Sequence, residues 1–215
     1  MKTKIIAVTG GIGSGQSTVS RCFEKLECKV INADQVAKQI VDTNADVQDQ
    51  LRKEFGNEIF DKNQILIRDK MAQIVFSDKN RIQRLNKIVH PALIAELILQ
   101  IENAIEQNKF KLIIIDAALV YELAMERFFD KVIVVTARKD VRIKRVQQRD
   151  KLTRTQIIDR IQNQIDLSEK AKWADYVIQN NGSLEYLEKN VQKIFNDLTK
   201  DQSKKRYYKR KSRQH

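Results

Sequence analysis

We expect an α/β fold built on a doubly wound parallel sheet of about five strands. Five short apolar runs predict these strands, at residues 5–8, 29–31, 112–115, 132–135 and 176–178. Helical patterns separate the runs, and apolar strands that alternate with helices are typical of a parallel sheet covered on both faces. The content of one Pro and six Gly favours long helices over a loop-rich fold.

The first half of the chain combines one amphipathic helix with a long helical block. Apolar residues at 19, 22, 23 and 26 follow the i, i+3, i+4, i+7 pattern of a helix that buries one face. No strand pattern interrupts residues 45–108, which are too long for a single crossover helix. We therefore expect a helical insertion there that holds a second substrate, with Pro91 ending or starting one of its helices.

The second half predicts a helical lid over about residues 138–170 and a final helix. Ile157, Ile161 and Ile165 form an apolar stripe after a possible capping box that runs from Thr153 to Gln156. Asn181-Gly182 predicts a turn, and Ser183 is a candidate cap for a last helix that ends near residue 198. Residues 1–200 thus form a single expected domain.

Charge is concentrated at the C-terminus. The chain has 40 Lys and Arg against 28 Asp and Glu, a net charge of +12, and residues 201–215 supply half of it through seven basic residues against Asp201 alone. We expect this tail to be disordered, and it is the only segment that favours nucleic-acid binding. The remaining charge suits an enzyme with polyphosphate ligands.

The location that the sequence indicates is the cytoplasm. Cys22 and Cys28 have no second pair and no Cys/His cluster beside them, so we expect reduced thiols rather than disulfides or a metal site. The first four residues run into a short strand rather than a signal peptide, and we find no apolar run close to the ~18 residues of a membrane span. No membrane partner is expected.

A glycine-rich motif follows the first predicted strand and precedes a helix. Its spacing, Gly10-x-x-x-x-Gly15-x-Ser17, is that of a P-loop in which Gln16 replaces lysine. Backbone N–H groups in such a loop face inward, and the helix N-terminus adds about half a positive charge, so an ATP β-phosphate fits there. The expected ATP-binding residues are Gly11, Ile12, Gly13, Ser14, Gly15, Gln16, Ser17 and Thr18. The alternative is a tight turn without a ligand, and the dinucleotide pattern G-x-G-x-x-G fails.

The neutral Gln16 amide cannot offset negative charge as an ammonium does. Loss of one preorganised donor raises the activation free energy by about 3 to 4 kcal/mol. Either the protein is therefore a slow or inactive enzyme, or another cation covers the phosphates. Arg145 and Arg149 are candidates because their i, i+4 spacing puts them on one helix face, with Arg138 and Arg142 upstream. Taken alone, these residues fit a solvated basic face better.

Two aspartates follow predicted strands, where doubly wound folds bind ligands. Asp34 suits a base that accepts the proton of an acceptor hydroxyl, and it suits equally well a cap for the helix through Ile40. Asp116 resembles the acidic residue that reaches Mg²⁺ in P-loop enzymes, and the Ser17 hydroxyl can bind the same ion.

Taken together, the motifs resemble the dephospho-CoA kinase family over nearly the whole chain. The matching residues include the segment 9–15, Asp34, Asn86, His90, Leu119, Glu122, Arg145, Arg149, Arg160, Gln164, Asp175 and Asn181-Gly182. The resemblance implies transfer of the ATP γ-phosphoryl group to the ribose 3′-hydroxyl of dephospho-CoA, with Mg²⁺ as cofactor.

The resemblance also implies roles for individual residues. Asp34 would orient or deprotonate the hydroxyl, Arg145 and Arg149 would close over the phosphates, and Asn86 and His90 would hold the substrate. By itself His90 fits a packed or helix-terminal histidine better. Trp173 has no implied role and is expected in the core.

Three residues depart from the family pattern. Gln16 replaces a lysine, Asn32 a common aspartate and Ala118 a proline, and Arg138 and Arg142 have no clear counterpart. An alternative function is therefore a catalytically weak homologue that binds nucleotide or CoA and associates with RNA through its tail. A kinase for another nucleotide would leave the matches from Asn86 to Asn181 unexplained.

Overall fold

The structure is a computed structural model that describes residues 3–76 and 78–200. The basic tail at 201–215 lies outside the described residues. Two compact units make up the chain: the first combines the segment up to Val30 with the segment from Gln107 onward, and the second is Ile31–Glu106.

A five-stranded sheet organises the first unit, with the strand order β2-β3-β1-β4-β5. The central strand β1 pairs in parallel with β3 and β4, and β4 pairs in parallel with β5. The strands are β1 (Lys4–Gly10), β2 (Lys29–Asn32), β3 (Leu112–Asp116), β4 (Lys131–Thr136) and β5 (Tyr176–Gln179). All five predicted strands are confirmed, and each extends one to three residues beyond its apolar run.

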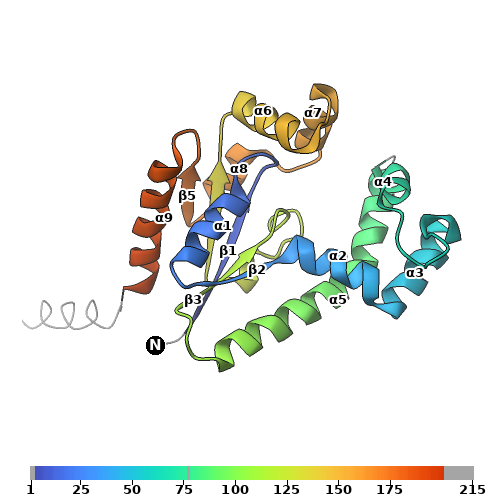
Figure 1. Ribbon diagram of the computed structural model, residues 1–215, viewed down its shortest axis with the longest axis horizontal. Coiled ribbons are helices and arrows are strands. Elements are labelled where there is room, and N and C mark those ends of the chain that lie inside the picture. The colour runs from blue at the N-terminus through green and yellow to red at the C-terminus, as the bar shows by residue number, and fades with distance from the viewer. Residues whose placement is uncertain (1–2, 77, 201–215) are drawn as a thin grey trace, which may run out of the picture. The chain divides into compact units, whose positions relative to one another are not determined.

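Helices α1 (Gln16–Lys25) and α9 (Leu184–Thr199) lie side by side on the sheet (Figure 1). Val19 and Phe23 of α1 and Leu187 and Val191 of α9 belong to one buried cluster with residues of β1, β3 and β4. This burial is what the period-3.6 stripe of α1 predicts. Ser183 caps α9 by accepting a hydrogen bond from the Tyr186 N–H, as expected.

Three short helices follow β4: α6 (Lys139–Asp150), α7 (Arg154–Gln162) and α8 (Leu167–Trp173). The first two share a small core of their own, formed by Ile143, Val146 and Ile157. The predicted capping box is present at the start of α7, with Thr153 and Gln156 satisfying each other's backbone N–H groups.

Trp173 is not in the core, contrary to our expectation, because its side chain is 55% exposed. It ends α8, where it makes an edge-on contact with Tyr121 at 5.5 Å between ring centroids. The fully buried residue of α8 is instead Lys170, whose Nζ forms an ion pair of 2.6 Å with Glu122 and also donates to the Ala118 carbonyl. A buried ion pair therefore joins α8 to the segment after β3.

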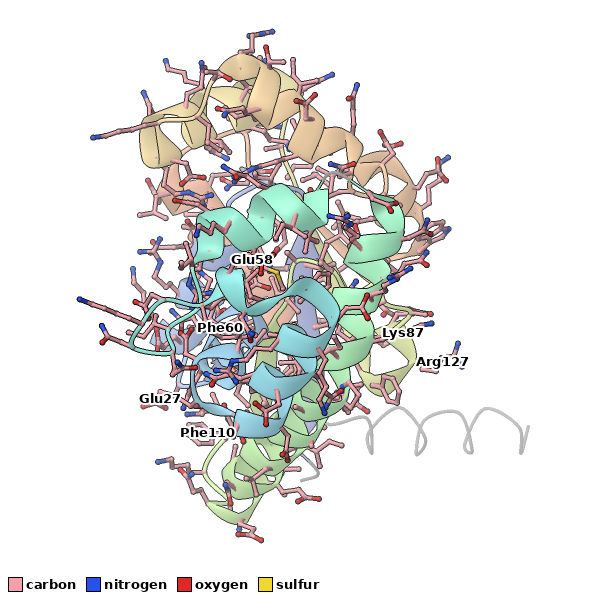
Figure 2. The ribbon with its side chains drawn as sticks, turned by 90° about the vertical axis from the view of Figure 1, so that its right-hand side faces the viewer. Glu27, Glu58, Phe60, Lys87, Phe110 and Arg127 are labelled. Atoms are coloured by element: carbon pink, nitrogen blue, oxygen red, sulfur yellow. The ribbon has the colours of Figure 1, made fainter. Side chains whose placement is uncertain are left out.

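The second unit is helical. Its elements are α2 (Ala33–Thr43), α3 (Ala45–Phe55), the 3₁₀-helix η1 (Asn57–Ile59), α4 (Arg68–Phe76) and α5 (Lys79–Glu106). Helices α2, α3 and α4 all pack against α5. Glu58 and Phe60 mark the connection from α3 to α4 in Figure 2, where the Arg52 guanidinium lies 4.4 Å from the Phe60 ring centre.

Pro91 neither ends nor starts a helix; it lies inside α5, which corrects our expectation. Proline removes one helical hydrogen bond at about 3 kcal/mol, and the helix continues because Val89 and Leu93 beside it are buried. Within the described residues, α5 is also long and apolar enough to span a membrane, because Asn80–Glu106 contains an 18-residue window with a mean hydropathy of 1.4. We had expected no such segment, although length and composition alone are weak evidence for a span.

Candidate active site

The glycine-rich loop joins β1 to α1 in the first unit. Gly13 and Gly15 have φ angles of 76° and 90°, which side chains with a Cβ rarely adopt. Gly15 stands at the N-cap position of α1, so no side chain caps this helix. The helix begins at Gln16, and Ser17, the next residue, is exposed. Free N–H groups at the helix start and an exposed hydroxyl beside them are what a phosphate and its metal ion require.

Side chains from distant segments hold the loop from outside. The Ile12 N–H donates to Gln164 Oε1 at 2.9 Å, and the Ile12 carbonyl accepts from Arg142 Nε at 2.8 Å. The Ser14 carbonyl accepts from Asn180 Nδ2 at 2.8 Å and from the Arg145 guanidinium at 3.4 Å. These contacts fix the loop conformation from outside. They use the Ile12 N–H, and the Ser14 N–H donates to the Gly11 carbonyl at 2.9 Å, so the N–H groups left for a phosphate are those of Gly13, Gly15 and the start of α1.

Three of these anchors, Arg142, Gln164 and Asn180, had no role in our sequence-based site, although Gln164 is one of the residues that match the family. Asn180 directly follows β5, beside the Asn181-Gly182 turn, so its position at a strand end was a usable signal. Arg142 is 6% exposed, although basic residues on α6 suggested a solvated face. Only the folded chain shows that this arginine points at the loop.

Gln16 is turned toward Asp116. Its amide nitrogen donates to Asp116 Oδ1, which ties the residue at the lysine position to the end of β3. Asp116 is 3% exposed. Burial raises the pKa of this carboxyl, and hydrogen bonds from Gln16 and Ser20 oppose the rise. The two predicted site residues are thus in direct contact.

The lid arginines differ in what they contact. Arg145 is half-buried, and its guanidinium donates to the Ser14 carbonyl of the loop. Arg149 forms two hydrogen bonds with Asp150, at 2.7 and 2.8 Å, and this pairing raises the pKa of Arg149 and lowers that of Asp150. The side chain of Arg149 is 65% exposed, so its ion pair is weak and the guanidinium can exchange partners.

The residues expected at the acceptor belong to the second unit. Asn32 caps α2 by accepting from the Gln35 N–H at 2.9 Å, so the alternative that Asp34 is the cap is wrong. Asp34 lies in the first turn of α2 and is exposed. Asn86 and His90 are four residues apart on α5, hence on one face, and both are half-buried. Burial lowers the pKa of His90, so its imidazole is neutral at pH 7.

Comparisons with known proteins agree on one family. The family model for dephospho-CoA kinase (CoaE) matches residues 4–186. The dephospho-CoA kinase of Fusobacterium nucleatum is 38% identical over 194 residues, which are 90% of this chain and 98% of that protein. Among solved structures, TT1252 from Thermus thermophilus has a TM-score of 0.79 at 29% identity, covering 93% of this chain and all of that one. A dephospho-CoA kinase from Campylobacter jejuni has a TM-score of 0.67 at 29% identity, covering 91% and 96% of the two chains.

Proposed function

Because the chain belongs to the dephospho-CoA kinase family, we propose that it transfers the γ-phosphoryl group of ATP to the ribose 3′-hydroxyl of dephospho-CoA. This reaction yields coenzyme A and ADP. The observation that carries the proposal is the glycine-rich loop between β1 and α1, which lies inside the family match and leads into a helix start that no side chain caps, so the first N–H groups of α1 are free to bind phosphate.

ATP binding is assigned to the first unit. The backbone of Gly11–Gly15 and the start of α1 would hold the β- and γ-phosphates, because the helix dipole and the free N–H groups favour negative charge there. Arg145, which already contacts the loop, would add charge next to the phosphates. Arg149 would join it by leaving Asp150. Phosphoryl transfer depends mostly on positioning and charge stabilisation, which these groups supply.

Acceptor binding is assigned to residues of the second unit. Asp34 would accept the proton of the 3′-hydroxyl as that oxygen attacks the γ-phosphorus, for which an exposed carboxylate is suited. Asn86 and His90 would hydrogen-bond the acceptor. A neutral His90 can donate and accept a hydrogen bond but adds no charge.

Mg²⁺ fits the oxygen atoms present. Ser17 and Asp116 offer a hydroxyl and a carboxylate, and Mg²⁺ commonly binds one or two protein oxygens together with substrate phosphates. Among the described residues there is no cluster of three or more His, Cys, Asp or Glu side chains that could hold a metal by themselves. When bound with ATP, the ion neutralises charge on the β- and γ-phosphates. Asp116 Oδ1 already accepts from Gln16, and the carboxylate has further lone pairs with which it would bind the ion.

We expect the enzyme to act in the cytoplasm, without a membrane partner. Nucleic-acid binding stays a prediction about the tail at 201–215. It would show as RNA affinity that falls steeply with salt and is lost when the tail is deleted.

The function is tested by following ADP release with a coupled assay and CoA formation by chromatography. Asp34→Asn should lower kcat by about 10²- to 10⁴-fold, the usual contribution of a general base. Asp46→Asn is a matched control, because Asp46 is also an exposed acidic residue in the first turn of a helix, α3. Absence of CoA with wild-type protein, despite ATP binding, would favour the nucleotide-binding homologue. Equal rates for the two variants would remove Asp34 from the reaction.

A further inference from the structure

Arg142 is a buried cation that lies against the outside of the phosphate-binding loop. Its Nε donates to the Ile12 carbonyl at 2.8 Å. A Cβ placed on Gly11 would lie 2.5 Å from a terminal nitrogen of the same guanidinium. The charged group therefore rests directly on the Gly11–Ile12 backbone, and the lack of a side chain at Gly11 is what permits this approach.

The charge of Arg142 is not matched by a close carboxylate. In the described part of the chain, no Asp or Glu oxygen forms an ion pair with it. Asp166 interacts with it at longer range, but the Asp166 carboxylate accepts hydrogen bonds from Ser168 at the start of α8. Burying an unpaired charge is unfavourable. An anion bound on the other side of the loop would offset this penalty.

The loop lacks a cation where P-loops have one. Gln16 is neutral, and its amide is bound to Asp116 rather than directed at the phosphate position. Other basic residues are less suited to replace that charge: Arg145 is more exposed to solvent than Arg142, and Arg149 is paired with Asp150. Solvent screens exposed charges much more than buried ones.

We propose that Arg142 supplies the positive charge of the missing P-loop lysine, acting on the β-phosphate of ATP through the Gly11–Ile12 backbone. This inference rests on the proposed function, since it needs ATP in the loop. Arg142 is a positioning residue by this account: it holds the Ile12 carbonyl on the outer side and raises the electrostatic potential on the inner side.

Calorimetric titration of the full-length protein with ATP and with AMP tests the inference. Arg142→Gln should weaken ATP binding about 10- to 100-fold, the size expected for a unit charge a few ångströms away in a partly buried site. AMP, which has no β-phosphate, should lose much less affinity. Arg142→Lys keeps the charge and should bind ATP within about fivefold of wild type, on the same reasoning. Lys144→Gln is the matched control, because it removes the same charge from an exposed position on α6.

Equal losses of ATP and AMP affinity in Arg142→Gln, or equal losses in the Gln and Lys variants, would show a purely structural role and overturn the proposal. Unchanged ATP affinity in Arg142→Gln would do the same. Wild-type protein that binds no ATP would instead overturn the proposed function.

A second measurement does not need a stable Arg142→Gln variant. The Nε–H resonance of Arg142 in ¹⁵N-labelled wild-type protein can be assigned as the peak that Arg142→Lys lacks. It should shift when ADP is added and shift far less with AMP. Equal shifts with the two nucleotides would count against the proposal.

Discussion

Lysine in place of Gln16 should raise kcat for dephospho-CoA phosphorylation. A preorganised donor to developing charge contributes about 3 to 4 kcal/mol. In this protein the new ammonium would meet Asp116, which already accepts from the Gln16 amide and is 3% exposed. An ammonium that is hydrogen-bonded to Asp116 is less available to the phosphates. This competing bond reduces the stabilisation by about 1.5 to 3 kcal/mol, the value of a hydrogen bond to a charged group. The net gain in transition-state stabilisation is therefore about 0 to 2.5 kcal/mol, with a middle value near 1 kcal/mol, which is roughly 5- to 10-fold in kcat.

The assay is coupled ADP release at saturating ATP and dephospho-CoA, with melting temperatures recorded for each protein. Gln16→Met is the control, because it keeps the length of the side chain and removes its donors. If Gln16→Lys is no faster than wild type while equally stable, the neutral residue does not limit catalysis. If Arg142 carries the missing charge, the gain should be larger in Arg142→Gln than in wild type, since the two cations then replace each other.

Three further predictions concern side chains that support the site. Asn180→Ala should lower the free energy of unfolding by about 1 to 2 kcal/mol and raise KM for ATP, because the Ser14 carbonyl loses a buried hydrogen bond. Urea unfolding measures the first effect and steady-state kinetics the second, and an unchanged KM would contradict the prediction. Burial lowers the pKa of His90, so the unfolded chain takes up a proton first and stability should fall as pH drops below about 6.5; His90→Asn should show a shallower fall between pH 7 and 5, and an equal slope would refute the assignment. Lys170→Met should lower the free energy of unfolding, measured by urea titration, by about 3 to 5 kcal/mol, because it leaves Glu122 buried without its cation. The double variant with Glu122→Leu should recover much of this loss, and a double variant no more stable than Lys170→Met would contradict the prediction.

Local patterns predicted most of the sheet and the loop. Strands such as β3 are continuous apolar runs, and a glycine-rich segment between a strand and a helix restricts the chain to one type of turn. The helix caps at Thr153 and Ser183 were also predictable from the sequence, because each cap depends on residues at most three positions away.

The errors concern choices that local sequence leaves undecided. Asn32 and Asp34 are both good caps two residues apart, and only the backbone at the end of β2 decides that Asn32 is used. Pro91 would end an isolated helix, but packing around α5 outweighs its local effect. The burial of Arg142 and Lys170 and the exposure of Trp173 depend on partners far away in sequence, which no local pattern contains.

The outer contacts of the loop have a dynamic consequence. Arg142 and Gln164 hold the two ends of the Ile12 residue, its carbonyl and its N–H, and both come from the segment that we expect to close over ATP. Movement of that segment must either carry the loop with it or break these bonds. The Ile12 amide proton should therefore exchange with solvent at a rate that reports lid opening, and bound nucleotide should slow it. One backbone amide thus offers a direct record of whether lid and loop move together.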